Sequence, residues 1–132
     1  MSTQIEEKII EVPKRRLILI CGSRLGTNGA VDTIKDILSK YDPMNTTILH
    51  GGAPGIDSIA GQIASMMKFP VKIEYADWSR GRRGGPERND RMLAMNPDHV
   101  YAIPDKKSIG TWDTINKAIK KGIPTTVIEK WL

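Results

Sequence analysis

The sequence predicts a single α/β domain in which a doubly wound, all-parallel β-sheet carries helices on both faces. Residues 16–21, RLILIC, form a continuous apolar run, which is typical of a strand buried on both faces of a parallel sheet. Further short apolar runs alternate with stretches of helical periodicity along the chain. Glycine-rich turns follow the first two runs, and 132 residues suit one domain.

The expected elements follow one another in strand–helix order. Residues 1–14 are a polar N-terminal arm, and residues 15–132 form the domain. The expected strands are 16–21, 46–50, 71–75, 99–103 and 125–128. The expected helices are 29–41, 56–67, one that begins near Pro86, and 111–121. Right-handed crossovers between these elements favour a Rossmann-like sheet of about five strands in the order 3-2-1-4-5.

Composition limits the classes of function. With 39% hydrophobic and 27% charged residues, the chain has the balance of a soluble globular protein. No apolar run approaches the roughly 18 to 20 residues that cross a bilayer, and acids stand where a secretory peptide has cations, so we expect a cytoplasmic protein with no membrane partner. The net charge of +5 favours anionic ligands.

Cys21 is the only cysteine, which excludes an intramolecular disulfide. It has no cysteine partner and no histidine cluster near it, so we expect no metal site, and nothing in the sequence indicates a cofactor. We expect Cys21 to be a buried, unreactive residue at the end of the first strand.

In doubly wound sheets, ligands bind outside the carboxyl ends of the strands where the winding direction reverses. The first candidate loop there is Gly22-Ser23-Arg24. Its glycine allows a ligand to approach the backbone, its serine offers a hydroxyl, and its arginine can hold a phosphate through two hydrogen bonds. A plain turn with a solvated arginine is the alternative.

The second candidate loop is Gly51-Gly52-Ala53 with Gly55, which precedes a helix whose free N–H groups can bind an anion. Asp57, in the first helical turn, either complements the helix dipole or bonds to a ribose or to the turn itself. We expect the preceding histidine to be structural. The loop matches neither the GxGxxG nor the GxxxxGK[ST] pattern, so neither NAD nor P-loop ATP chemistry follows.

The third candidate loop, residues 76–89, concentrates arginines beside Trp78, whose ring could stack on a base. A solvated charged face is the alternative for Arg80, Arg82 and Arg83. Arg88 and Asn89, expected in the first turn of the third helix, should project toward the same crevice and contact the ligand.

The fourth candidate loop leads through Ser108 and Gly110 to Thr111, which either caps the last helix or binds a phosphate oxygen. Asp113, one turn further on, is placed to act on a sugar or as a general base, and Asp105 is the other acid of this loop.

With these loops laid out, residues 17–128 resemble the SLOG superfamily, which includes the LOG phosphoribohydrolases and the Smf/DprA proteins, and they are most similar to its YspA-like branch. The resemblance rests on these stretches: Gly22-Ser23-Arg24, His50-Gly51-Gly52-Ala53 with Gly55 and Asp57, Ala76-Asp77-Trp78, Gly85-Pro86 with Arg88-Asn89 and Met92-Leu93, and Ser108 with Gly110-Thr111.

The resemblance implies a nucleotide-type ligand and, in the LOG enzymes, cleavage of the N-glycosidic bond of a nucleoside monophosphate by an arginine and a glutamate. This chain departs from their PGGxGTxxE motif, because residues 104–114 read PDKKSIGTWDT and place Thr114 at the glutamate position. Asp113 is adjacent, but neighbouring helical residues point about 100 degrees apart.

Two functions from different classes remain open at this stage. The first is a sensor or processing domain that binds a nucleotide-derived phosphorylated ligand, with hydrolysis by Arg88 and Asp113 as its enzymatic form. The alternative is a single-stranded nucleic-acid-binding module related to DprA, which the basic third loop favours. We also expect a homodimer or higher homo-oligomer, and a third reading makes the domain an oligomeric scaffold with an idle pocket.

Overall fold

The computed structural model describes residues 4–10, 14–25 and 29–129, and its core is a five-stranded parallel sheet in the order β3-β2-β1-β4-β5. The strands are β1 (Arg16–Gly22), β2 (Thr46–His50), β3 (Val71–Ile73), β4 (His99–Ile103) and β5 (Thr125–Val127). The helices are α1 (Ala30–Leu38), α2 (Ile56–Met66), α3 (Gly84–Ala94) and α4 (Ile109–Lys120), with a short 3-10 helix η1 (Trp78–Arg83) before α3. The predicted fold class and strand order are therefore confirmed.

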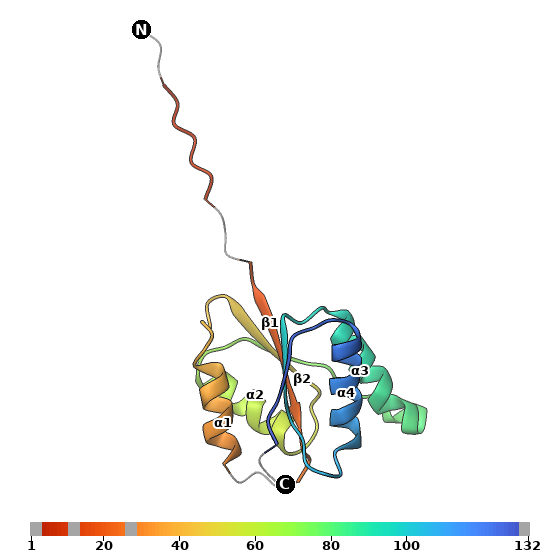
Figure 1. Cartoon of the computed structure of the whole chain (residues 1–132). Helices are drawn as coiled ribbons and strands as arrows, with labels where there is room; N and C mark the ends of the chain where they lie inside the picture. Colours follow the sequence, from red (N-terminus) through yellow and green to blue (C-terminus); the bar gives the residue numbers. More distant parts are fainter. Residues whose placement is uncertain (1–3, 11–13, 26–28, 130–132) are drawn as a thin grey trace.

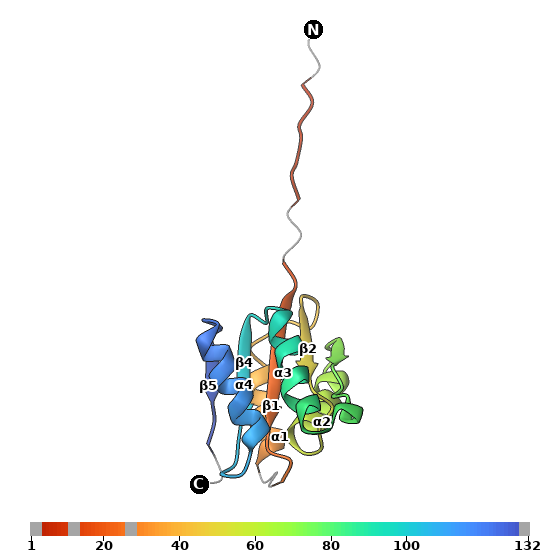
Figure 2. The same cartoon turned by 90° about the vertical axis from the view of Figure 1, so that its right-hand side faces the viewer.

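The sheet lies between two layers of helices, with α1 and α2 on one face and α3 and α4 on the other (Figures 1 and 2). Ile18 and Ile20 of β1 belong to the core under α1 and α2, whereas Leu19 and Cys21 belong to the core under α3 and α4. Because side chains alternate along a strand, β1 supplies both cores at once. This is why its sequence is apolar without interruption.

Several element boundaries differ from the predicted ones. Strand β3 is three residues long, where residues 71–75 were expected, because its neighbour β2 ends at His50, which pairs with Ile73. The expected loop contains η1, whose first turn is capped by the Asp77 carboxylate accepting the Ser79 N–H at 3.1 Å. Helices α3 and α4 begin two residues before the predicted starts, and α1 ends at Leu38, three residues early.

The carboxyl ends of the strands lie at the lower end of the domain in Figure 1. Strand β1 pairs with both β2 and β4, so the winding reverses between β1 and β4, as the predicted order requires. Residues 4–10 are exposed and extend from the opposite end of the domain (Figure 1). The division of the chain at residue 15 stays a prediction. In the described part of the chain, no helix has the length and apolar character needed to cross a membrane.

Candidate functional site

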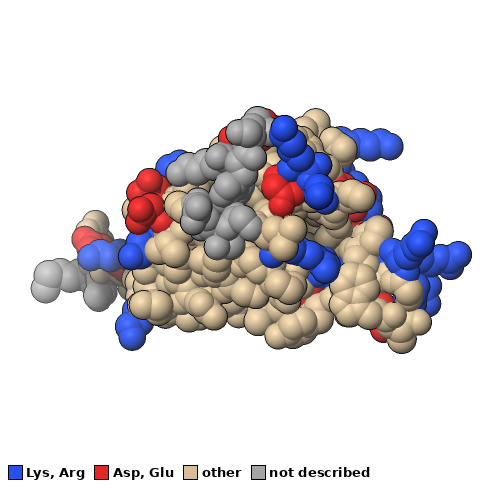
Figure 3. Space-filling model, turned by 90° about the horizontal axis from the view of Figure 1, so that it is seen from below, with Lys and Arg blue, Asp and Glu red and all other residues tan. Residues whose placement is uncertain are grey.

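A cavity of about 460 Å³ lies at the carboxyl ends of β1 and β4, where the winding reverses. Figure 3 views this end of the molecule from below and shows groups of Lys and Arg side chains around it. Nine of the sequence-predicted residues line the cavity: Gly22, Arg24, Ala53, Asp57, Arg88, Asn89, Ser108, Gly110 and Thr111. They come from four segments that are far apart in the sequence, so the structure brings the predicted loops together.

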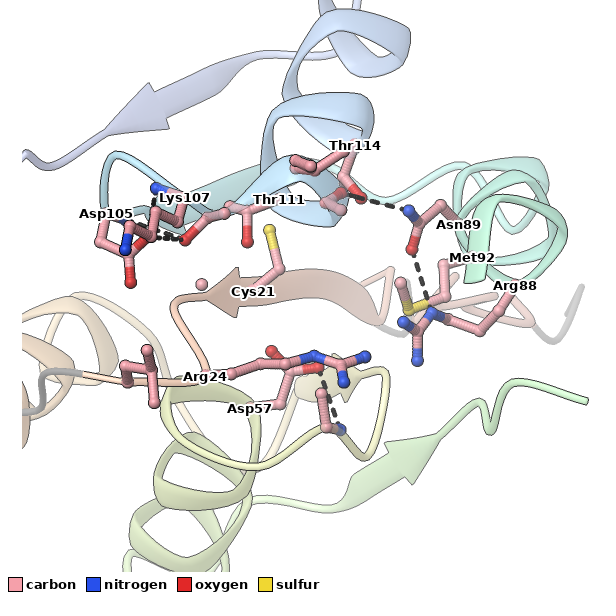
Figure 4. A pocket seen from close by; sticks show the side chains of 16 residues that line it. Cys21, Arg24, Asp57, Arg88, Asn89, Met92, Asp105, Lys107, Thr111 and Thr114 are labelled. Atoms are coloured by element: carbon pink, nitrogen blue, oxygen red, sulfur yellow. Dashed lines mark hydrogen bonds between the residues drawn. The ribbon is translucent and has the colours of Figure 1, made fainter. Parts of the chain in front are cut away.

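In Figure 4, Arg24 and Asp57 lie on one side of the cavity and Thr111 and Thr114 on the other, with Cys21 between them at the end of β1. Cys21 is 5% exposed, as expected of a buried residue, and burial raises the pKa of its thiol. The charged groups that line the cavity are of both signs: Arg24, Arg88, Lys107, Asp57 and Asp105.

The glycine-rich turn before α2 is closed by its own hydrogen bonds. The Asp57 carboxylate accepts the N–H of Gly51 at 3.0 Å and that of Ala53 at 3.5 Å, and Ile56 donates its N–H to the Ser23 carbonyl at 3.0 Å. Of the three readings of Asp57, the bond to the turn itself is the one that the structure shows. The N–H groups of Gly51, Ala53 and Ile56 are thus already used, whereas within the described residues those of Asp57 and Ser58, in the first turn of α2, have no partner.

Gly51, Gly52 and Gly55 accordingly shape the turn and do not line the cavity. Gly55 has a φ of +82°, and a Cβ atom there would collide with the Ser23 carbonyl oxygen. A Cβ at Gly51 would lie 2.5 Å from Nη1 of Arg88. His50 is buried, and its Nδ1 accepts the Gly52 N–H at 3.0 Å, which gives it the structural role expected of it.

The first turn of α4 also has open donors, and here they lie beside residues that line the cavity. Ile109 and Trp112 donate their N–H groups to Lys107 and Ser108, but within the described residues the N–H groups of Gly110 and Thr111 have no such partner. Thr111 is 8% exposed and lines the cavity, and its hydroxyl makes no hydrogen bond to any described residue. Free helix N-terminal donors attract negative charge. This end of α4 is therefore the part of the cavity best suited to an anion.

Ser108 does not cap α4, because its hydroxyl is bound to Asp105. The Asp105 carboxylate accepts the Ser108 hydroxyl at 2.8 Å and the Lys107 N–H at 2.7 Å, and it also contacts the Ser23 hydroxyl. These hydrogen bonds lower the pKa of Asp105, and the bond from the Ser23 hydroxyl has the largest effect. Ser23 is fully buried and is not a lining residue, so it joins the loops after β1 and β4 from behind the cavity wall.

Arg88 and Asn89 join two further loops of the site. Arg88 donates to the Gly51 carbonyl at 2.5 Å through Nη1 and to the Asn89 side-chain oxygen at 3.0 Å through Nε. Asn89 donates in turn to the Gly110 carbonyl at 3.2 Å and to Asp113 at 3.1 Å. Both residues are buried in the second turn of α3, one turn later than predicted, because α3 begins at Gly84.

Asp113 lies outside the set of lining residues, and its carboxylate is held by Lys117 at 3.0 Å and by Asn89. The adjacent Thr114 lines the cavity instead and donates to the Gly110 carbonyl at 3.2 Å. The helical repeat explains the difference, because the two side chains point about 100 degrees apart. The carboxylates that do line the cavity are Asp57 and Asp105.

Trp78 also lies outside the lining residues, on η1, where it is 58% exposed. The Arg24 guanidinium carbon stands 5.7 Å from the centroid of the Trp78 ring, which is cation–π distance. Arg24 thus connects the cavity to the exposed basic segment of Arg80, Arg82 and Arg83.

Sequence reasoning missed four lining residues: Leu25, Met92, Lys107 and Ile109. Met92 had a usable signal, because it follows Arg88 by four residues on a helix and therefore shares its face. Leu25, Lys107 and Ile109 had none, since their places depend on how the loops fold.

Asp57 should give the protein a pH-dependent stability. Burial, opposed by the Arg88 charge and the Gly51 N–H, raises its pKa from 3.8 to about 6. A raised folded-state pKa means that the folded protein binds the proton more tightly, so the contribution is full below about pH 4 and is lost as the pH rises through about 6. The shift corresponds to about 3 kcal/mol of unfolding free energy.

As the pH rises from 4 to 7, wild type should lose the unfolding free energy that the protonated Asp57 contributes. Asp57→Asn has no titrating group there, so its unfolding free energy should rise relative to that of wild type. Urea denaturation of both proteins across that range measures the difference. Parallel profiles for the two proteins would contradict the raised pKa of Asp57.

This chain is similar to a known phage protein over most of its length. No family model matches the sequence. The Gene 61 protein of Mycobacterium phage D29 is 35% identical over 117 residues, which cover 83% of this chain and 93% of that protein. The chain belongs to the family of this phage protein.

Solved structures similar to this Gene 61 family member include two DNA processing proteins A. The protein from Streptococcus pneumoniae matches with a TM-score of 0.72 and 16% identity over 89% of this chain and 52% of that chain. The protein from Helicobacter pylori, which has a single-stranded DNA binding mode, matches with a TM-score of 0.68 and 20% identity over 90% of this chain and 67% of that chain. This chain thus spans about half the length of the pneumococcal protein.

A third similar structure is the C-terminal domain of the PF1911 hydrogenase from Pyrococcus furiosus, with a TM-score of 0.53 and 17% identity over 92% of this chain and 97% of that chain. At these identities the likeness concerns the fold alone. The two DprA structures agree in fold with the resemblance to the SLOG superfamily.

Proposed function

We propose that this chain binds a nucleotide or nucleotide-derived phosphorylated ligand in the cavity at the carboxyl ends of β1 and β4, as a sensor or processing domain. The observation that carries the proposal is Thr111: this residue is only 8% exposed and lines the cavity, and its hydroxyl has no partner among the described residues, beside the open N–H groups of α4. A buried polar group without a partner is costly, so a ligand oxygen that accepts from it gains affinity.

The charges around this position suit a phosphate. Arg24 and Lys107 line the cavity and can supply charge-assisted hydrogen bonds to its oxygens. A cavity of about 460 Å³ falls in the usual range for small-molecule sites of roughly 300 to 1,000 Å³. Leu25, Met92 and Ile109 supply apolar surface for a base or sugar. The site therefore offers both the anionic and the apolar contacts that a nucleotide needs.

The geometry supports binding better than hydrolysis. In the hydrolytic form of the hypothesis, Arg88 and Asp113 carry the chemistry, but Arg88 holds the Gly51 carbonyl and Asp113 is held by Lys117 and Asn89 outside the lining residues. The LOG glutamate position is occupied by Thr114, which has no carboxylate. We also propose membership of the YspA-like branch, on the strength of Ala76-Asp77-Trp78 and Gly85-Pro86 with Arg88-Asn89.

Thr111→Val tests the proposed site, because valine keeps the shape of threonine and removes the hydroxyl. A hydrogen bond to a charged phosphate oxygen contributes about 1.5 to 3 kcal/mol, so we expect the affinity for a bound nucleotide to fall by roughly 12- to 160-fold. Isothermal titration calorimetry against nucleoside mono-, di- and triphosphates, ADP-ribose and cyclic nucleotides measures it.

Thr33→Val is a matched control, because Thr33 is a buried helical threonine that bonds to Gly29 on α1 and does not line the cavity. It should leave the affinity unchanged. An absence of heat for the whole panel with the wild-type protein would remove the proposal for these ligands.

A second candidate function, binding of single-stranded nucleic acid, is favoured by the exposed segment of Trp78, Arg80, Arg82 and Arg83 beside the cavity. An aromatic ring among cations is the arrangement on which bases stack while phosphates are neutralised. The charge of Arg80 is partly neutralised, because its guanidinium pairs with Glu87 at 2.7 Å. DprA from Helicobacter pylori, with the same fold, has a single-stranded DNA binding mode.

For this candidate we expect fluorescence anisotropy with an oligothymidine to show binding that weakens steeply with salt. Replacing Arg80, Arg82 and Arg83 together by alanine should reduce the slope of log K against log salt by about 0.7 for each lost phosphate contact. Alanine at Lys35, Lys120 and Lys121, which are also exposed, removes the same charge elsewhere and serves as the control. No binding at low salt, or an equal loss in both triple variants, would reject a site on this segment.

A further inference from the structure

A second cavity, of about 650 Å³, lies beside the outer strand β3, between this strand and α2. Three of its apolar lining residues are exposed to solvent: Met66 is 79% exposed, Tyr75 65% and Ile73 39%. We call this surface the β3 groove. It is separate from the nucleotide site, and nothing in the proposed function uses it.

Within the part of the chain that the structure describes, the backbone along the β3 groove has hydrogen-bonding groups without partners. Ile48 donates to the Pro70 carbonyl and Glu74 donates to the His50 carbonyl, both at 2.9 Å, so residues 70, 72 and 74 are the ones that face β2. Because the bonding direction alternates along a strand, the N–H and C=O groups of Val71 and Ile73 point away from the sheet. An extended segment placed along this edge would complete the ladder.

Residues 4–10 form a segment of suitable chemistry that is uncovered in the structure. All are exposed, and Ile5 and Ile9 are 84% and 91% exposed. In Figure 1 they extend away from the domain. In an extended strand, Ile5, Glu7 and Ile9 share one face, and Glu6 and Lys8 share the other.

We propose that residues 5–9 of a second copy of this chain add to β3 as a parallel strand, with Ile5 beside Val71 and Ile9 beside Tyr75. This register puts both isoleucines on the face of the β3 groove, because Val71, Ile73 and Tyr75 line it. On the opposite face it sets Glu6 beside Lys72 and Lys8 beside Glu74, so both pairs join opposite charges. Gln62 and Ser65, which also line the groove, offer hydrogen bonds to Glu7.

The occupant is a second copy because the chain's own arm is too short for this arrangement. A parallel connection within one sheet needs a crossover of roughly a dozen or more residues. Only residues 10–15 separate the added strand from β1, which begins at Arg16. Exchange of arms between two copies removes this restriction and gives a closed dimer in which each copy both donates and accepts a strand.

Ile73→Pro tests the pairing, because proline removes an N–H that points away from β2 and is tolerated on an edge strand. We expect sedimentation equilibrium to show a wild-type dimer and at least an about tenfold weaker dimer for Ile73→Pro, since a ladder bond and its neighbours are lost. Val127→Pro is the matched control, because Ile128 bonds to Ala102 and leaves the Val127 N–H on the free edge of β5. A monomeric wild type, or dissociation by Val127→Pro alone, overturns the proposal.

A cysteine pair tests the occupant and the register. Tyr75→Cys and Ile9→Cys are made in separate copies, which are then mixed and oxidised; the native Cys21 is buried. The expected product on a non-reducing gel is a disulfide-linked dimer of the two variants, absent when Val127→Cys replaces Tyr75→Cys. If the double variant Ile9→Cys/Tyr75→Cys gives only a monomer with an internal disulfide, the arm binds its own domain and the second-copy assignment fails.

Discussion

Replacing Arg88 with alanine is expected to destabilise the protein by about 3 kcal/mol and to abolish ligand binding in the nucleotide site. The guanidinium donates to the Gly51 carbonyl and the Asn89 side chain while only 7% exposed. Hydrogen bonds from charged groups contribute about 1.5 to 3 kcal/mol each, and their loss leaves buried acceptors without partners. Asp57 also loses the positive charge that lowers its pKa.

Urea denaturation and calorimetry of Arg88→Ala measure the two effects. Arg91→Ala is the matched control, because Arg91 lies on the same helix but is 42% exposed in its pair with Glu74. Exposed pairs contribute roughly 0 to 1 kcal/mol, so this variant should remain near wild type. Arg88→Lys keeps the positive charge but lacks the planar guanidinium with its several N–H donors. Its stability should fall between those of wild type and Arg88→Ala. Equal losses for the alanine variants of Arg88 and Arg91 would contradict the role assigned to Arg88.

The second large effect is expected for Gly55→Ala, which should lose at least about 2 kcal/mol of unfolding free energy. The backbone there has φ +82° and ψ −128°, a region that residues with a Cβ avoid. The added methyl group would also meet the Ser23 carbonyl oxygen and the Arg24 backbone, which cannot move without opening the loop after β1. Thermal unfolding should show a melting temperature lower by about 8 °C or more.

Gly85→Ala is the comparison for this variant. Gly85 lies in α3, and a Cβ there would approach the Trp78 ring at an ordinary contact distance of 3.6 Å. Alanine favours a helix over glycine by about 1 kcal/mol, so Gly85→Ala should be neutral or stabilising. If both variants melt at the same temperature, the turn tolerates a side chain at position 55 and our account of its geometry is wrong.

The sequence predicted the sheet well because its strongest signals are independent of distant contacts. A strand buried on both faces has to be apolar throughout, as Ile18 to Cys21 are, and the turns after β1 and β2 are marked by glycine. The ends of the strands and helices were predicted less accurately. Strand β3 ends early because its neighbour β2 ends at His50 opposite Ile73, and no pattern within residues 71–75 reports the register of that pairing.

The candidate site was predictable as a gathering of loops but not in its details. The rule that ligands bind where the winding reverses located Arg24, Asp57 and Thr111 around one cavity. The glycine-rich turn before α2 looked like an open anion site, but the sequence does not show whether a nearby carboxylate will satisfy its N–H groups. Asp113 and Thr114 were hard to tell apart, because their roles depend on the phase at which α4 meets the cavity.

The hydrogen bonds within the turn before α2 affect which ligands the cavity can distinguish. Since Asp57 accepts the N–H groups of Gly51 and Ala53, one wall of the cavity is preorganised and costs little ordering entropy when a ligand binds. On the same wall the ionised Asp57 carboxylate, which lines the cavity, repels negative charge. Differences in affinity between phosphorylated compounds should then arise at the opposite wall, where α4 begins.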